Sequence, residues 1–151
     1  MKKVILNIFI FFLISNCGFS PIYSKINNQN FDIKIETIEG ERLINNLIVS
    51  QLSRNKNDQS ENKFYIDINT KYEKLINSKD ATGATTNYQL TAISEIDIRN
   101  KNKNERMTIS EKFIMDKNEN TIDERNYERT IKQIFASSIT QKIIFRINSM
   151  K

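Results

Sequence analysis

The chain has 151 residues, enough for one domain with a single core, and its 38% apolar content is below the average for globular proteins. It carries 23 basic and 18 acidic residues, and this mild excess of +5 is far from the clustered basic surface of a nucleic-acid-binding protein. The charge therefore predicts no nucleic-acid partner. Histidine is absent and there is one cysteine, so we also expect no metal or other cofactor, no disulfide and no enzymatic activity.

An apolar segment with a basic start opens the chain. Lys2 and Lys3 precede residues 4–14, an apolar run that is broken only by Asn7. This run is too short for a membrane-spanning helix, which needs about 20 apolar residues, and it has the layout of a secretory signal peptide. The alternative, a buried helix of a cytosolic domain, does not account for the position at the N-terminus or for the cysteine that follows.

Cys17 is the only cysteine of the chain and comes directly after this segment. Ser15 suits the positions before a lipidated cysteine, whereas Asn16 departs from the small residue that is usual there. We predict a lipoprotein signal peptide over residues 1–16, with lipidation, palmitate included, at Cys17. Gly18 is not the aspartate that often retains lipoproteins in the inner membrane, so we expect an outer-membrane anchor with the domain on the periplasmic face. More than one acyl chain is what stable anchoring requires.

The rest of the chain divides into a lipidated N-terminus and tether at 17–30 and an α+β domain at 31–151. Alternating apolar and polar residues indicate strands, and apolar residues at three- and four-residue spacing indicate amphipathic helices. In chain order we predict a strand at 31–36, a helix at 41–54, a strand at 64–73, a turn at 77–84, a strand at 88–98, a hairpin tip at 100–104, a strand at 107–115, a polar segment at 116–125 and a helix from 126 onward.

This order, β-α-β-β-β-α, predicts an α+β fold. Three consecutive strands with short links form an antiparallel meander, and two helices with one apolar stripe each can cover one face of it. We therefore predict a two-layer sandwich in which two helices cover a four-stranded, mostly antiparallel sheet. Because the strands are long for a small domain, the sheet should extend past the helices and present an exposed polar face or end.

Three carboxylates are candidates for catalytic groups. Glu95 and Asp97 lie two apart on one strand and point to the same side, as a pair that serves glycoside hydrolysis would. We favour a position on the solvent face, opposite Ile96. Glu111 lies on the same face of its strand as the apolar residues Ile109 and Phe113, so it is expected to point toward the core. An edge position, a bulge or an error in the predicted register explains this placement better than a catalytic role.

A basic cluster lies at the hairpin tip: Arg99, Lys101, Lys103 and Arg106, with asparagines between them. Mobile cations beside amide groups suit phosphate- and sugar-rich ligands. RNA fits less well, because no aromatic residues are interleaved for base stacking. The remaining alternative is a solvated turn without a ligand.

Two motifs resemble LptE-type LPS-assembly lipoproteins, especially their alphaproteobacterial branch. The first is Cys-Gly-Phe-Ser-Pro-Ile-Tyr at 17–23, which is similar to the start of the mature proteins of that family. The second is Asp-Ala-Thr-Gly-Ala-Thr-Thr-Asn-Tyr at 80–88, followed by Gln-Leu-Thr-Ala, although an arginine is commoner where Thr86 or Asn87 stands. Residues 124–143 also resemble the family's charged C-terminal helix.

The resemblance implies a fold of two helices on a four-stranded sheet and a function without catalysis. Members of the family plug the lumen of the LptD-type outer-membrane β-barrel, help it to assemble and contact lipopolysaccharide (LPS) as it is inserted into the outer leaflet. From their charge, and not from the resemblance, we take Arg99, Lys101, Lys103 and Arg106 as candidate LPS-binding residues. Two alternatives stay open: a stand-alone periplasmic lipoprotein that binds an anionic lipid or glycan, and an envelope hydrolase that uses Glu95, Asp97 and Glu111.

Overall fold

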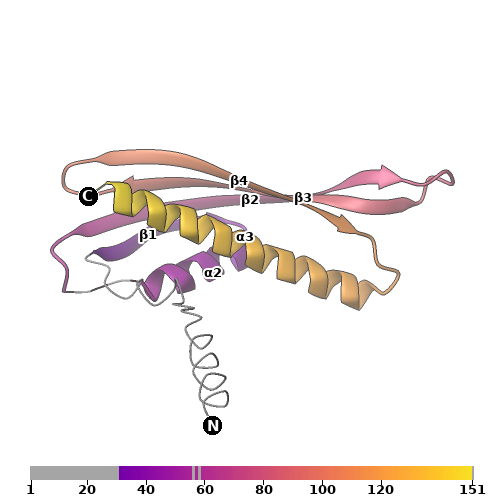
Figure 1. Ribbon diagram of the computed structural model, residues 1–151, viewed down its shortest axis with the longest axis horizontal. Helices are drawn as coiled ribbons and strands as arrows, with labels where there is room; N and C mark the ends of the chain where they lie inside the picture. The colour runs from indigo at the N-terminus through magenta and orange to yellow at the C-terminus, as the bar shows by residue number, and fades with distance from the viewer. Residues whose placement is uncertain (1–30, 56, 58, 151) are drawn as a thin grey trace, which may run out of the picture.

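The computed structural model describes residues 31–55, 57 and 59–150 (Figure 1). The predicted signal peptide, the lipidation site Cys17 and the tether lie outside this part of the chain. The elements are β1 (Asp32–Gly40), α2 (Arg42–Ser53), β2 (Lys63–Lys79), β3 (Thr85–Arg99), β4 (Asn104–Asp116) and α3 (Thr121–Ser149). Their order confirms the predicted β-α-β-β-β-α arrangement.

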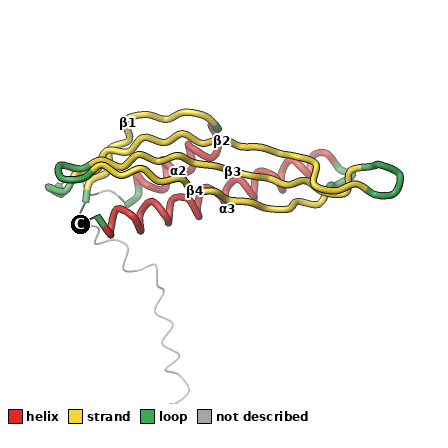
Figure 2. The backbone as a smooth tube through the Cα atoms, turned by 90° about the horizontal axis from the view of Figure 1, so that it is seen from above, coloured by secondary structure: helices red, strands yellow, loops and turns green. Residues whose placement is uncertain are grey.

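The four strands form one sheet in the order β1-β2-β3-β4, so β1 and β4 are its edges (Figure 2). β1 pairs with β2 in parallel through the α2 crossover, and β2, β3 and β4 form the antiparallel meander. Both helices lie on the same side of the sheet, which leaves the other face open (Figure 1). The predicted two-layer α+β sandwich is therefore confirmed.

The core lies between the two helices and the helix-facing side chains of the strands. Alternate residues of β2, starting at Phe64, are buried as far as Thr70, and the same alternation buries β3 from Ile98 back to Leu90. The helices contribute one stripe each. Ile44, Ile48 and Leu52 come from α2, and Ile131, Phe135, Ile139, Ile143 and Ile147 come from α3.

Past Thr70 the alternation of burial weakens. The β2–β3 hairpin continues beyond the helices toward its tip at residues 80–84, as the strand lengths predict (Figure 1). This end of the sheet is less polar than expected, because Leu75, Ile76 and Ile114 are each more than half exposed.

Two predicted boundaries were wrong by five residues or more. β2 runs to Lys79, so the turn at 77–84 shrinks to residues 80–84, where Asp80 Oδ1 accepts hydrogen bonds from the amides of Thr82 and Ala84. α3 starts at Thr121 and not at 126, because the Asn120 side chain caps it by accepting a 2.9 Å hydrogen bond from the Ile122 amide. Both segments, the end of β2 and the start of α3, are rich in polar residues, so the apolar pattern that indicates a strand or a helix is missing there.

Candidate functional site

Arg99 and Arg106 of the predicted basic cluster lie on the open face of the sheet and are held by carboxylates. Arg99 donates through Nη1 to Asp67 Oδ2 at 2.6 Å and pairs through Nη2 with Glu36. Arg106 binds Asp97 with two hydrogen bonds, of 2.7 and 2.9 Å. The hydrogen bond from Arg106 holds the pKa of Asp97 below its ordinary value, and that from Arg99 does the same for Asp67.

Lys101 and Lys103, the other two members, are exposed at the β3–β4 tip. The turn that carries them is fixed by Asn100, whose Oδ1 accepts from the amides of Asn102 and Lys103 at 2.9 and 2.7 Å. The Asn100 amide donates back to the Lys103 carbonyl at 2.9 Å. Within the described part of the chain neither lysine forms an ion pair, so these two cations remain available for a ligand.

Lys63 joins this tip, although the sequence did not suggest it. A small cavity of about 70 Å³ lies between the start of β2 and the turn, and it is lined by Glu61, Asn62, Lys63, Phe64, Asn100, Lys101 and Asn102. The antiparallel register, with Tyr65 opposite Arg99, brings the two segments together. No sequence pattern near Lys63 marks this position, because it depends on strand pairing alone.

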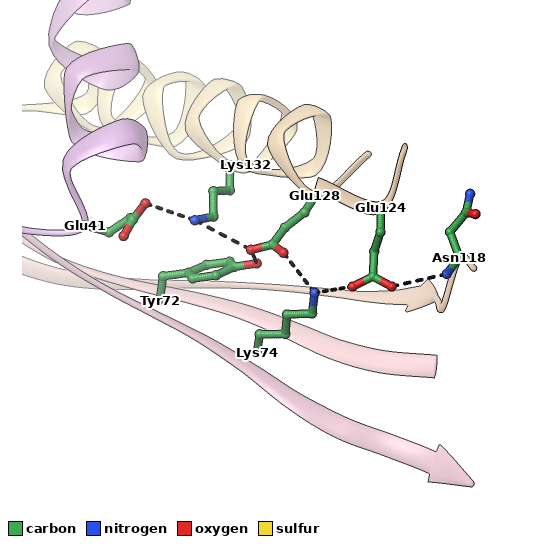
Figure 3. Close-up of polar contacts among 7 residues, drawn as sticks. All are labelled: Glu41, Tyr72, Lys74, Asn118, Glu124, Glu128 and Lys132. Atoms are coloured by element: carbon green, nitrogen blue, oxygen red, sulfur yellow. Dashed lines mark hydrogen bonds and ion pairs between the residues drawn. The ribbon is translucent and has the colours of Figure 1, made fainter. Parts of the chain in front are cut away.

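A second polar cluster lies beneath the N-terminal half of α3 (Figure 3). Glu128 Oε1 accepts from the Tyr72 hydroxyl at 2.8 Å, and Lys74 Nζ bridges Glu124 and Glu128 at 2.9 and 3.0 Å. Lys132 pairs with Glu41 at 3.1 Å, and its Nζ lies 3.9 Å from the centre of the Tyr72 ring. In this region α3 contacts the sheet through charges and hydrogen bonds in addition to apolar contacts, such as the edge-on packing of Tyr127 against Phe113.

The charges of this cluster support each other. Burial raises the pKa of Glu128, but the hydrogen bonds from Lys74 and Tyr72 outweigh burial, so the net pKa is lowered. Burial and the contact with Glu128 raise the pKa of Tyr72, which therefore stays protonated. The pKa of Lys74 is raised overall, because its two carboxylate partners outweigh burial.

Replacing Glu128 with glutamine should destabilise the domain by about 1–2 kcal/mol at neutral pH, the range for a hydrogen-bonded charge that is partly exposed. The pKa of Glu128 is lowered on folding from its ordinary 4.5, so its stabilisation is present above about pH 4.5 and is lost as the pH falls through the folded-state pKa. Urea unfolding from pH 7 to pH 3 checks this, with Glu119→Gln, an exposed acid near the start of α3, as control. A difference from wild type that stays constant down to pH 3 would contradict this role.

The three carboxylates considered for catalysis lie on opposite faces of the sheet. Glu95 and Asp97 point to the open face, where Glu95 is exposed. Glu111 points to the helix side and accepts hydrogen bonds from Ser138 Oγ at 2.7 Å and Lys142 Nζ at 2.5 Å. Its edge position on β4 explains how an acid can stand in phase with core residues. The hydrolase alternative thus has no site that all three acids share.

A groove of about 680 Å³ runs between β4 and the C-terminal half of α3. On the strand side it is lined by residues 107–110, and on the helix side by residues that include Gln141 and Phe145, whose ring is 75% exposed. Consecutive strand residues point to opposite faces, so a cavity that touches four in a row follows the free edge of the strand.

None of the helices within the described residues has both the length and the apolar character needed to cross a membrane.

The arrangement of two helices on one face of a four-stranded sheet is shared with a solved lipoprotein structure. Rare lipoprotein B from Shewanella oneidensis superimposes with a TM-score of 0.60 at 12% sequence identity, over 78% of this chain and 96% of that one. Lipoproteins from Caulobacter crescentus CB15 and Nitrosomonas europaea match with TM-scores of 0.46 and 0.45, at 12% and 14% identity, over 77% and 76% of this chain and 88% and 82% of theirs. No sequence family model and no curated protein sequence matches the chain. The likeness to rare lipoprotein B thus establishes a shared fold.

Proposed function

We propose that the chain is an outer-membrane lipoprotein, anchored through Cys17, that plugs an LptD-type β-barrel, assists its assembly and takes part in inserting LPS into the outer leaflet. The observation that carries this proposal is the agreement between a sequence motif and the fold of the domain. The motif at 17–23 resembles LptE-type lipoproteins, and the domain behind it has the fold of rare lipoprotein B.

The open face of the sheet suits the interior of a large barrel. The lumen of such a barrel is polar, so a plug must be compatible with water on its outside. The open face carries the ion pairs of Arg99 and Arg106 and polar side chains such as Asn69, Glu95 and Lys112.

Depletion of the chain tests the proposal in cells. We expect less of the assembled LPS-translocon barrel in the outer membrane and less LPS at the cell surface. Unchanged barrel levels together with unchanged surface LPS would reject the proposal. The alternative of a stand-alone lipoprotein would then gain support if the purified chain bound an anionic lipid or glycan as a monomer.

The candidate LPS contacts separate into two pairs. Replacing Lys101 and Lys103 with glutamine should weaken LPS binding about thirtyfold, since each cation near a phosphate-rich surface contributes about 1 kcal/mol. The melting temperature should not change, because exposed charges contribute little to stability. Replacing Arg99 and Arg106 instead breaks the pairs with Asp67 and Asp97. Any loss of LPS binding in that variant therefore combines the loss of two cations with the loss of their ion pairs.

Equilibrium binding to purified LPS, by fluorescence anisotropy, is the measurement for this prediction, and Lys112→Gln on the open face of β4 is the control. If the double lysine variant binds LPS as tightly as the wild type, the tip is a solvated turn.

A further inference from the structure

The end of the domain at which the described chain begins also carries the lysine-bearing tip. Asp32 pairs with Lys63 in the parallel ladder, so β1 and β2 start side by side. The β3–β4 tip lies at this same end, and the β2–β3 tip at residues 80–84 lies at the opposite end (Figure 1). The residues from Cys17 to Asn30 extend at most about 50 Å, so a lipid on Cys17 keeps the first end within that distance of the bilayer. β2 has 17 residues and extends over about 56 Å, which places the other tip far from the point of attachment.

At this membrane-proximal end, the cavity of about 70 Å³ described above brings together two lysines from distant segments. Lys63 and Lys101 are both exposed, and neither forms an ion pair with another described residue. Asn62, Asn100 and Asn102 add amide groups to the lining. Glu61 is the one carboxylate of the lining, and it opposes an anion there.

Both walls of this cavity are fixed by the backbone. The Asn62 carbonyl accepts a 2.8 Å hydrogen bond from the Asp32 amide, which ties the wall before β2 to β1. The opposite wall is the turn that Asn100 closes. The backbone of both lysines is held in this way, so it loses less freedom when a ligand binds than the backbone of a free loop.

We propose that this notch, formed by Lys63, Lys101 and the surrounding amides, binds the phosphate group of a membrane amphiphile. Lysine binds phosphate as a point charge, and side-chain amides donate hydrogen bonds to the remaining oxygens. A cavity of this size holds a group of a few heavy atoms, such as a phosphate, and not a whole headgroup. The proposal rests on the proposed lipid anchor at Cys17, which brings the notch close to a phosphate-rich surface.

The test titrates the purified acylated chain, in micelles of a neutral detergent, and follows backbone amide shifts by NMR. The titrants are inorganic phosphate, a short-chain phosphatidylglycerol, a short-chain phosphatidylcholine and LPS. We expect saturable shifts confined to the amides of 61–63 and 100–103. Lys63→Gln combined with Lys101→Gln should weaken binding about thirtyfold, and Glu61→Gln should strengthen it about fivefold. Lys71→Gln, an exposed lysine of β2 far from the notch, should leave binding within about twofold.

The titrants also identify the source of the phosphate. Saturation by phosphatidylglycerol assigns the notch to phospholipid headgroups, and saturation by LPS alone assigns it to LPS. If no titrant produces saturable shifts at these amides, or if Lys71→Gln weakens binding as much as the double variant, the notch is not a phosphate site. Co-purification of the double variant with the barrel separates the two proposals, because loss of the notch should leave the plug in place.

Discussion

Replacing Cys17 with alanine should abolish acylation completely, and chain that is not bound to the barrel should leave the outer membrane. Each buried methylene of an acyl chain contributes about 0.8 kcal/mol to membrane attachment, yet one chain alone gives only marginal binding. Loss of all acyl groups at residue 17 therefore removes the lipid anchor. Fractionation of the envelope, with mass spectrometry of the N-terminal peptide, measures both the location and the modification.

Ser20→Ala is the matched control, because it alters a neighbouring polar residue and leaves the cysteine. We expect the control to be acylated and to fractionate with the outer membrane. Wild-type chain that retains residues 1–16 and an unmodified Cys17 would contradict the lipoprotein prediction, while the α+β domain would be unaffected.

Gly40→Ala should destabilise the domain by roughly 3–5 kcal/mol, a large part of the stability of a small domain. Gly40 ends β1 with a φ of +89°, and a Cβ there would lie 2.0 Å from the carbonyl oxygen of Thr70. That carbonyl belongs to the middle of β2 and accepts a 2.7 Å hydrogen bond from the Glu41 amide, so it cannot move away without loss of this bond. The change therefore strains the connection from β1 to α2.

Gly83→Ala separates the steric clash from the backbone strain. Gly83 has a similar φ of +85°, but no atom lies within 4 Å of the place where its Cβ would be. Only the cost of a left-handed conformation remains, about 1–2 kcal/mol. Urea denaturation of the two variants gives the comparison. If Gly40→Ala lost no more stability than Gly83→Ala, the contact with Thr70 would not be the reason for a glycine there.

The order of elements was predictable because most of the apolar residues repeat with a clear period. The alternation from Phe64 to Thr70 and the helical stripe from Ile131 to Ile147 are both visible in the sequence and both buried in the structure. The parallel pairing of β1 with β2 was not specified by such a pattern, since periodicity tells which face of a strand is buried and not which neighbour it takes.

The part of β2 beyond Thr70 was harder to predict because many of its contacts with α3 are polar. Tyr72 and Lys74 face α3, where Tyr72 binds Glu128 and Lys74 binds both Glu124 and Glu128. A lysine that looks like a surface residue in the sequence thus lies between the two layers. The start of α3 was hidden for the same reason, because its first turns contribute charges in place of an apolar stripe.

The candidate site was predicted in part. The sequence identified Lys101 and Lys103 at the tip, and the structure leaves both exposed. Charge counting could not show that Arg99 and Arg106 are bound by acids from neighbouring strands, or that Lys63 lies beside the tip. These relations depend on the register of the sheet, which joins residues far apart in the chain.

The most direct test of the proposed plug is co-purification of the acylated chain from outer membranes in a gentle detergent. We expect a large LPS-assembly β-barrel to elute with the chain at a one-to-one ratio, and this complex to withstand a second purification step. An acylated chain that elutes alone, from membranes in which the barrel is present, would reject the proposed plug.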